Sequence, residues 1–167
     1  MEFFSDRLAY RKITMADLPV YLRMAMDENV MMYITGKSLS AHDAKLRLKT
    51  MVDTNAEIPG IGFYMAFERN SGDFIGLGKL VVIHDSTAEI GYSLLPQFWG
   101  RKYASEIAGF FIDYAHSLLN IKDIVALVNP GNAASKKLLA NFGFKWMETG
   151  FLNDLPTEIH MLEFNNR

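Results

Sequence analysis

The stretch Thr87-Ala-Glu-Ile-Gly-Tyr-Ser-Leu-Leu95, followed by Gln97-Phe-Trp-Gly-Arg-Lys-Tyr-Ala-Ser105, decides how this chain can fold. Its first part alternates as a strand does, with a period of two. Its second part opens a helix whose apolar residues recur at spacings of three and four, as one buried face requires. Those apolar residues are Ala104, Ile107, Ala108, Phe111, Ile112, Ala115, Leu118 and Leu119. The sequence therefore predicts a strand that leads into a helix through a short loop at Pro96–Gly100.

The start of this helix is a candidate anion-binding site. The first backbone N–H groups of a helix have no partner within it, and they lie at the positive end of its dipole. Gly100 removes a side chain where a ligand would approach the backbone, and Arg101 and Lys102 add two positive charges. The alternative is an ordinary helix start with a basic first turn. Positive side chains are unfavourable at this end of the dipole unless an anion binds there. Their presence therefore favours the anion-binding interpretation.

Length and composition narrow the class of protein. A chain of 167 residues predicts one domain, residues 1–167, that is long enough to bury one sizeable core. Half of the residues are apolar and 22% are charged, which is typical of a globular protein. The net charge of −2 argues against general nucleic-acid binding, which needs clustered Lys and Arg. No apolar run approaches the roughly 18–20 residues that cross a bilayer, so no membrane contact is expected.

Two further absences bear on chemistry and location. The chain has no cysteine, which excludes disulfides, thiolate metal ligands and a cysteine nucleophile. The four histidines are scattered without metal-ligand spacing, so no metal is expected; they are His42, His84, His116 and His160. The N-terminus shows no signal-peptide pattern. Together these features predict a cytoplasmic protein.

Periodicity along the chain predicts a mixed α/β (α+β) fold. The expected strands are Arg7–Ile13, Ile61–Glu68, Phe74–Ile83, Thr87–Leu95, Ile121–Val128, Phe144–Thr149 and Glu158–Phe164. The expected helices are Met15–Asp27 capped by Thr14, a Ser40-capped helix to about Asn55, the helix after Gly100, and Ala133–Asn141. Short polar connections make the strands from Ile61 to Leu95 antiparallel, whereas a right-handed crossover makes Ile121–Val128 parallel to Thr87–Leu95. We expect a mixed sheet of six to seven strands with about four helices on both faces.

Four segments, in this order, resemble the GCN5-related N-acetyltransferases (GNAT), and most closely the RimJ/RimL-like subgroup that acetylates ribosomal-protein N-termini. They cover nearly the whole chain. The segments are Arg7-Leu-Ala-Tyr-Arg11 with Asp17, Glu89-Ile-Gly-Tyr-Ser-Leu-Leu-Pro96, Trp99-Gly-Arg-Lys-Tyr-Ala-Ser-Glu106, and Asn129-Pro-Gly-Asn-Ala-Ala-Ser135 ending in Phe142-Gly-Phe144.

The resemblance implies an enzyme that passes an acetyl group from acetyl-CoA directly to a primary amine, with a peptide or protein N-terminus as the leading acceptor. One alternative acceptor is a small amine, such as a polyamine, an amino acid or an aminoglycoside. Acidic residues in the acceptor pocket would favour a polyamine or aminoglycoside, and an open groove would favour a peptide. A third alternative is a CoA-binding sensor module without catalysis.

The resemblance also assigns cofactor contacts. Gln97 and Gly100 match the family's pyrophosphate loop, whereas Lys102 stands where Gly or Ala is usual. The pyrophosphate would lie on the N–H groups from Gly100 to Ala104, and the pantetheine arm would pair with the backbone at Leu94 and Leu95. The remaining candidate contacts are Trp99, Arg101, Tyr103, Asn129 and Asn132. Aromatic residues that flank a buried helix more often belong to the core, which is the alternative for Trp99 and Tyr103; the alternative for Asn132 is a role as a helix cap.

Two residues are candidates for proton transfer. Glu89 is the candidate base, because an ionised carboxylate in an otherwise apolar strand needs a partner or a role; a solvated position or a basic neighbour is the alternative. The family's usual acid is a tyrosine four residues before the Gly-Phe pair, and here that position is Leu139. Ser135 stands where the subgroup has a serine proposed for the role, although it also fits a helix start capped by Asn132.

The acceptor pocket and the oligomeric state are expectations that rest on the resemblance alone. The region that walls the acceptor pocket in the family holds a cluster rich in methionine, of which about half is expected to be ordinary core: Met24, Met26, Met31, Met32 and Tyr33. Asp154, in the last hairpin, is a candidate contact for a cationic acceptor. Family members pair through their sheets or C-terminal strands, so a homodimer is expected.

Overall fold

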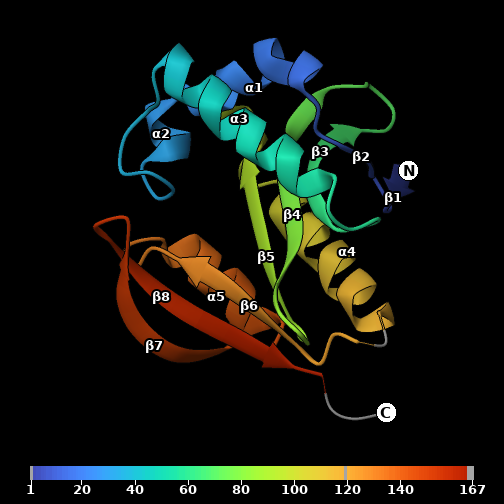
Figure 1. The fold of residues 1–167 in the computed structure, drawn as a ribbon, viewed down its shortest axis with the longest axis vertical. Helices are drawn as coiled ribbons and strands as arrows, with labels where there is room; N and C mark the ends of the chain where they lie inside the picture. Colours follow the sequence, from blue (N-terminus) through green and yellow to red (C-terminus); the bar gives the residue numbers. More distant parts are fainter. Residues whose placement is uncertain (1, 119, 165–167) are drawn as a thin grey trace.

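A computed structural model describes residues 2–118 and 120–164, so Leu119 lies outside the described residues. The chain forms one mixed sheet with helices packed on it (Figure 1). The strands are β1 (Glu2–Phe4), β2 (Leu8–Lys12), β3 (Gly62–Glu68), β4 (Phe74–His84), β5 (Thr87–Leu94), β6 (Asp123–Val128), β7 (Lys145–Leu152) and β8 (Leu155–Glu163). The helices are α1 (Leu18–Ala25), α2 (Glu28–Met31), α3 (Ala41–Asn55), α4 (Tyr103–Ser117) and α5 (Ala133–Asn141), with 3₁₀ turns at Met15–Asp17 and Pro96–Phe98.

The sheet has eight strands in the order β1-β2-β3-β4-β5-β6-β8-β7. The predicted mixed α/β class is confirmed, including the antiparallel run from β3 to β5 and the parallel pairing of β5 with β6. The additional strand is β1, which pairs with β2 at one edge. Its three residues are too few to show a period in the sequence.

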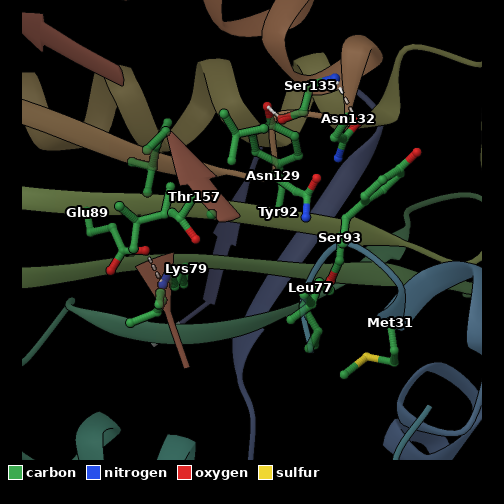
Figure 2. A pocket seen from close by; sticks show the side chains of 18 of the residues that line it. Met31, Leu77, Lys79, Glu89, Tyr92, Ser93, Asn129, Asn132, Ser135 and Thr157 are labelled. Carbon is green, nitrogen blue, oxygen red and sulfur yellow. Dashed lines mark hydrogen bonds and ion pairs between the residues drawn. The ribbon is translucent and has the colours of Figure 1, made fainter. Parts of the chain in front are cut away.

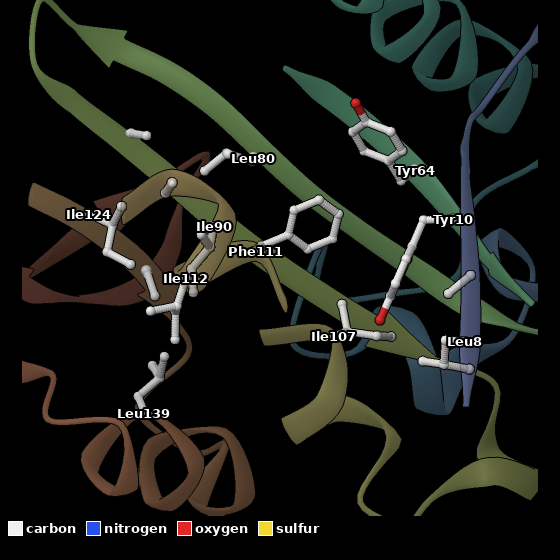
Figure 3. Close-up of a cluster of buried hydrophobic side chains, with 14 of the residues drawn as sticks. Leu8, Tyr10, Tyr64, Leu80, Ile90, Ile107, Phe111, Ile112, Ile124 and Leu139 are labelled. Carbon is white, nitrogen blue, oxygen red and sulfur yellow. The ribbon is translucent and has the colours of Figure 1, made fainter. Parts of the chain in front are cut away.

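The two faces of the sheet carry separate cores. On one face, Ile107 and Phe111 of α4 pack against Leu80 and Ile90 of the central strands, and Leu139 of α5 closes the far end (Figure 3). On the other face, α1, α2 and α3 cover the side chains that alternate with these. Residues of β5 with even numbers therefore face α4 and α5, and those with odd numbers face α1–α3.

The predicted helix Met15–Asp27 is a 3₁₀ turn followed by α1, and a separate short α2 comes after it. Asp17 stabilises the start, because its carboxylate accepts hydrogen bonds from the N–H and hydroxyl of Thr14 at 2.8 and 2.9 Å. The same carboxylate pairs with Arg11 at 2.7 Å, and this partner holds the pKa of Asp17 below its ordinary value. Strand β2 is thereby tied to the first helical layer.

The last hairpin is longer than the sequence predicts. Its strands extend to a two-residue turn at Asn153 and Asp154, which both have positive φ (49° and 63°). Asn and Asp tolerate this left-handed conformation, which two-residue hairpin turns require. Pro156 lies between the two predicted strands but belongs to β8, ahead of Glu158, where pairing with β6 begins.

Candidate functional site

Strands β5 and β6 diverge at the centre of the sheet. Their parallel pairing ends at Ile90 and Ala126, although β5 continues to Leu94 and β6 to Val128. Because Leu95 donates its N–H to Ile75 on the β4 side, strand alternation directs the backbone groups of Tyr92 and Leu94 into the gap. An extended ligand can pair with backbone groups exposed in this way.

The two candidate backbone contacts for the pantetheine arm, Leu94 and Leu95, differ in the hydrogen bonds that they already make within the protein. The N–H of Leu95 is used by the carbonyl of Ile75 at 3.0 Å. The carbonyl of Leu94 accepts a hydrogen bond from the indole of Trp99 at 3.0 Å, so Trp99 braces the end of β5. Trp99 remains 50% exposed, whereas Tyr103, the first residue of α4, is buried in the core.

The junction from β5 to α4 has an unusual backbone. Gly100 and Lys102 both have positive φ, 74° and 63°. Lys102 is the N-cap residue of α4, and no side chain caps that helix. An L-residue pays about 1–2 kcal/mol for the left-handed conformation, which explains why glycine suits this position. The first N–H groups of the 15-residue helix are therefore left without a capping side chain.

Arg7 holds this junction from outside. Its Nη1 donates to the carbonyl of Arg101 at 3.1 Å, and its guanidinium lies 4.2 Å from the centre of the Tyr103 ring. Glu106 accepts hydrogen bonds from the N–H and Nε of Arg7 and from the hydroxyl of Ser5, at 2.6–2.7 Å. Burial raises the pKa of Glu106, but these donors outweigh it and the pKa lies below its ordinary value. The sequence segments contained Arg7 and Glu106, yet gave no sign that they meet.

The junction from β6 to α5 is closed by side chains. Asn132 caps α5, because its Oδ1 accepts the N–H of Ser135 at 3.1 Å. Asn129 accepts the N–H of Gly131 at 2.9 Å and so folds the loop before it. The hydroxyl of Ser135 lies 2.8 Å from the hydroxyl of Tyr92 on β5. Burial raises the pKa of Tyr92, so its phenol stays protonated at neutral pH.

A cavity of about 310 Å³ runs through the gap between β5 and β6. It is lined from both faces of the sheet, by Tyr92 and Ser135 on the α5 side and by Glu89 and Leu77 on the α1–α3 side (Figure 2). The candidate residues Glu89, Asn129, Asn132 and Ser135 therefore share one cavity, whereas the loop from Gln97 to Ala104 does not line it.

Glu89 is held by a basic neighbour inside this cavity. Its carboxylate forms an ion pair with Lys79 of β4, and the side chains are only 13% and 25% exposed. The two residues are diagonal neighbours, because Lys79 pairs with Gly91 and Glu89 with Val81. A Cβ on Gly91 would lie 2.8 Å from Cε of Lys79, so the glycine leaves room for the lysine stem to cross β5. A basic neighbour was the alternative that the sequence left open for Glu89, but the sequence did not identify it as Lys79.

The methionine-rich region divides between wall and surface. Met24, Met31 and Tyr33 line the cavity, whereas Met26 and Met32 do not and are about half exposed. Asp154 is exposed in the hairpin turn and does not line the cavity, although its neighbour Asn153 does.

Within residues 2–118 and 120–164, no three His, Asp or Glu side chains come together as metal ligands. In the same residues, no helix is long and apolar enough to cross a bilayer.

The chain matches the acetyltransferase (GNAT) domain family model over residues 7–145. An N-acetyltransferase of Bacillus subtilis, YoaA, is 30% identical, and the match covers 84% of this chain and 81% of that one. A match to B. subtilis YkkB, at 29% identity, spans only about half of each chain, 54%.

Solved structures show the same fold. A GNAT-family acetyltransferase from Bacillus anthracis superposes with a TM-score of 0.82 at 18% identity, covering 98% of both chains. RimL, the ribosomal L7/L12 alpha-N-protein acetyltransferase in complex with coenzyme A, gives 0.78 at 16% identity and 95% of both chains. A spermidine N-acetyltransferase chimera from Vibrio cholerae gives 0.75 at 18% identity, covering 95% of this chain and 96% of that one.

This chain belongs to the GNAT family, and it is an acetyl-CoA-dependent N-acetyltransferase. The residues present fit acetyl-CoA in three respects. The helix α4 begins without a capping side chain, a Cβ at Gly100 would meet no atom within 4 Å, and the backbone of β5 is turned into the gap beside β6. The fold neighbours include enzymes named for a protein acceptor and for spermidine, so the fold alone does not define the acceptor.

Proposed function

We propose that this enzyme acetylates the primary amine at the N-terminus of a peptide or protein, as the RimJ/RimL-like subgroup does. The observation that carries the proposal is the cavity lined from both faces of the sheet, since the two reactants can then approach from opposite sides. The rim suits a peptide, because Tyr33, Ile34 and Leu152 line the cavity and are 38–50% exposed. These apolar side chains offer contacts for residues that follow the reacting amine.

The diphosphate would be held at the start of α4. Its N–H groups from Tyr103 onward lack a capping side chain, and Arg101 and Lys102 are exposed beside them. Gly100 leaves the approach open, while Gln97 lies on the preceding turn. Ala104 supplies a further first-turn N–H, so the main chain carries most of this contact.

The pantetheine arm would follow β5 into the gap. The N–H of Leu94 is directed toward β6 and can bond to the arm. The N–H of Leu95 is already bonded to the carbonyl of Ile75, so Leu95 would only lie beside the arm. Asn129 and Asn132 lie across the gap on the β6 side and are candidates for contacts with the arm's amides.

Acetyl-CoA, when bound, would supply the acetyl group to the amine, and CoA would leave as the thiolate. Ser135 would donate a hydrogen bond or proton to the departing sulfur, in place of the tyrosine that is absent at Leu139. Tyr92 can orient Ser135: if the phenol donates to the Ser135 oxygen at 2.8 Å, the hydrogen of Ser135 is left to point into the cavity. Tyr92 is a positioning residue that sequence reasoning missed.

Deprotonation of the amine falls to Glu89 with Lys79 beside it. Because the carboxylate is held by the lysine, we propose that it accepts the proton only from an amine that is already easily deprotonated. An α-amine, with a pKa of about 7.7–8.0, meets this requirement better than a lysine side chain at about 10.4. Positioning of the two reactants would supply most of the rate enhancement.

Release of free thiol from acetyl-CoA, measured with peptides, amino acids, polyamines and aminoglycosides, tests this function. We expect peptides with a free N-terminus to give the highest kcat/KM and N-blocked peptides to give none. Small amines as the better acceptors would favour the second acceptor class. Tight CoA binding without acetylation of any amine, unchanged by Ser135→Ala or Glu89→Gln, would identify a binding module instead.

The assembly proposed is a homodimer that covers strand β7. Every residue of β7 is exposed, including Trp146 at 59% and Phe151 at 79%. An edge strand with exposed apolar side chains invites pairing with a second copy. Light scattering should give twice the chain mass, and Trp146→Lys with Phe151→Lys should give the monomer mass.

We propose that this enzyme works in the cytoplasm.

A further inference from the structure

The cavity contains an unusual balance of charge. Among the described residues that line it, three are Arg, Lys or Glu: Arg47, Lys79 and Glu89. Lys79 and Glu89 form an ion pair with each other, so their charges cancel locally. Arg47 is left over, and the cavity carries one net positive charge.

The Lys79–Glu89 pair is built into the sheet. Both residues face α1–α3 from adjacent strands, and Gly91 provides the space in which the lysine stem crosses β5. With the two side chains only 25% and 13% exposed, separating the pair would leave a poorly solvated charge behind. The charge of Glu89 is therefore balanced by Lys79, and the pair leaves no net negative charge to attract a polycation.

Arg47 has no such commitment. It lies on α3, and none of the ion pairs formed within residues 2–118 and 120–164 includes it. Its neighbour is Tyr21, a buried residue of α1 that also lines the cavity: burial raises the pKa of the Tyr21 phenol, and the nearby Arg47 opposes that rise. Arg47 is exposed where it lines the cavity, and the neutral phenol beside it does not balance its positive charge.

We propose that the acceptor carries a carboxylate as well as the amine that is acetylated, and that Arg47 binds this carboxylate. The inference rests on the proposed acetyl transfer and names the chemical class of the acceptor. A guanidinium in a cavity walled by Met24, Met51 and Phe63 gains from a carboxylate through a charge-assisted, two-pronged hydrogen bond. The same charge repels a polycation, for which the cavity offers no uncommitted carboxylate.

The carboxylate contact would also favour reaction by positioning the acceptor, whose amine reacts in its neutral form. Two sources supply this chemistry: a free amino acid, and a peptide N-terminus followed by an acidic residue.

Matched acceptors test the proposal with the full chain at saturating acetyl-CoA. Leucine is compared with leucinamide, and a Ser-Glu peptide amide with its Ser-Gln counterpart, alongside spermidine. We expect the carboxylate member of one pair to have a kcat/KM at least about tenfold higher, as a charged hydrogen bond allows. The pair that shows the preference identifies the source, amino acid or acidic peptide.

Two variants assign the preference to Arg47. Arg47→Gln should abolish it by raising KM for the carboxylate member alone, and Arg47→Lys should retain part of it. Lys45→Gln is the matched control, because Lys45 is an exposed cation on the same helix that does not line the cavity. This control should keep the full preference. Equal loss in Lys45→Gln and Arg47→Gln would trace the effect to general surface charge and overturn the proposal.

Different results would overturn this inference and the proposed function. If leucinamide and the Ser-Gln peptide are acetylated as fast as leucine and the Ser-Glu peptide, or if spermidine is acetylated faster than both carboxylate acceptors, the carboxylate inference is wrong and acetyl transfer stands. If no amine releases thiol above background, both are overturned.

Discussion

The two strand-to-helix junctions that flank the gap are built in opposite ways. At the β5–α4 junction, Lys102 adopts positive φ, no side chain caps the helix, and Arg7, from the connection between β1 and β2, donates a hydrogen bond to the loop. At the β6–α5 junction, Asn132 caps the helix from within and leaves Ser135 in contact with Tyr92. In the function proposed above, the first junction binds an anion through main-chain N–H groups, and the second provides the hydroxyl groups for proton transfer. Variants at the two junctions should therefore fail differently.

The largest expected effect is at the β6–α5 junction. If Ser135 is the proton donor, Ser135→Ala should lower kcat about 100-fold, at the lower end for loss of a general acid. Tyr92→Phe removes only the hydrogen bond that orients Ser135, so a loss of about tenfold is expected. Steady-state thiol release, with KM for acetyl-CoA measured in parallel, checks both values.

Ser117→Ala, at the exposed end of α4, is the control and should retain full kcat. A kcat for Ser135→Ala within a factor of about three of the unmodified enzyme would remove Ser135 from the mechanism. The two hydroxyls act as one unit if the double variant loses no more than Ser135→Ala alone.

The next effect is on stability at the β5–α4 junction. Glu106→Gln weakens three hydrogen bonds from Ser5 and Arg7, and we expect it to lower the free energy of unfolding by about 2 kcal/mol. The loop should loosen as well, so KM for acetyl-CoA should rise while kcat changes little. Urea unfolding at pH 7 and enzyme kinetics measure the two effects.

The same variant has a pH signature. The pKa of folded Glu106 lies below its ordinary value of 4.5, so its contribution is complete above pH 4.5. That contribution is lost as the pH falls through the lowered, folded-state pKa, and the difference between Glu106→Gln and the unmodified chain should shrink there. Asp17→Asn is the matched control: it breaks a similar pair with Arg11 but should leave KM for acetyl-CoA unchanged. Equal changes of KM in both variants would contradict a local role for Glu106.

A smaller effect is expected from the cap of α5. Asn132→Ala should cost about 1 kcal/mol of unfolding free energy, whereas Asn132→Asp should keep the cap. If Asn132 also contacts the cofactor through its amide, Asn132→Asp will raise KM for acetyl-CoA without loss of stability. An Asn132→Ala variant with unchanged stability would show that the cap is not significant.

The smallest effect has opposite signs in stability and binding. Lys102→Gly relieves a left-handed residue, which costs about 1–2 kcal/mol, but adds chain entropy of about 0.5–1 kcal/mol, so a net gain of about 0.5–1 kcal/mol is expected. Loss of the exposed charge should raise KM for acetyl-CoA about threefold. Lys102→Ala should show the rise in KM without the gain in stability. A less stable Lys102→Gly protein would contradict the assignment of strain.

The elements of the fold followed from the sequence because each has a local period or signal. Strand β5 alternates, α4 repeats at three and four, and Ser40 caps α3 as predicted. The elements that were missed, β1 and α2, are three and four residues long and show too little of any period.

The contacts within the cavity could not be predicted from the sequence, because they depend on pairing between segments that are distant along the chain. Glu89 meets Lys79 only through the register of β4 with β5 and the space at Gly91. Tyr92 meets Ser135 across 43 residues of sequence. Arg47 is one of several charged residues on α3, and nothing in the pattern distinguishes it from its neighbours.

The most direct test of the account is calorimetric titration with coenzyme A and with pantetheine, which has the same arm but no diphosphate. If main-chain N–H groups at the start of α4 hold the diphosphate, coenzyme A should bind with saturating heat and raise the melting temperature, and pantetheine should bind at least about 100-fold more weakly. Equal binding of the two ligands, or no heat from coenzyme A, would contradict the account.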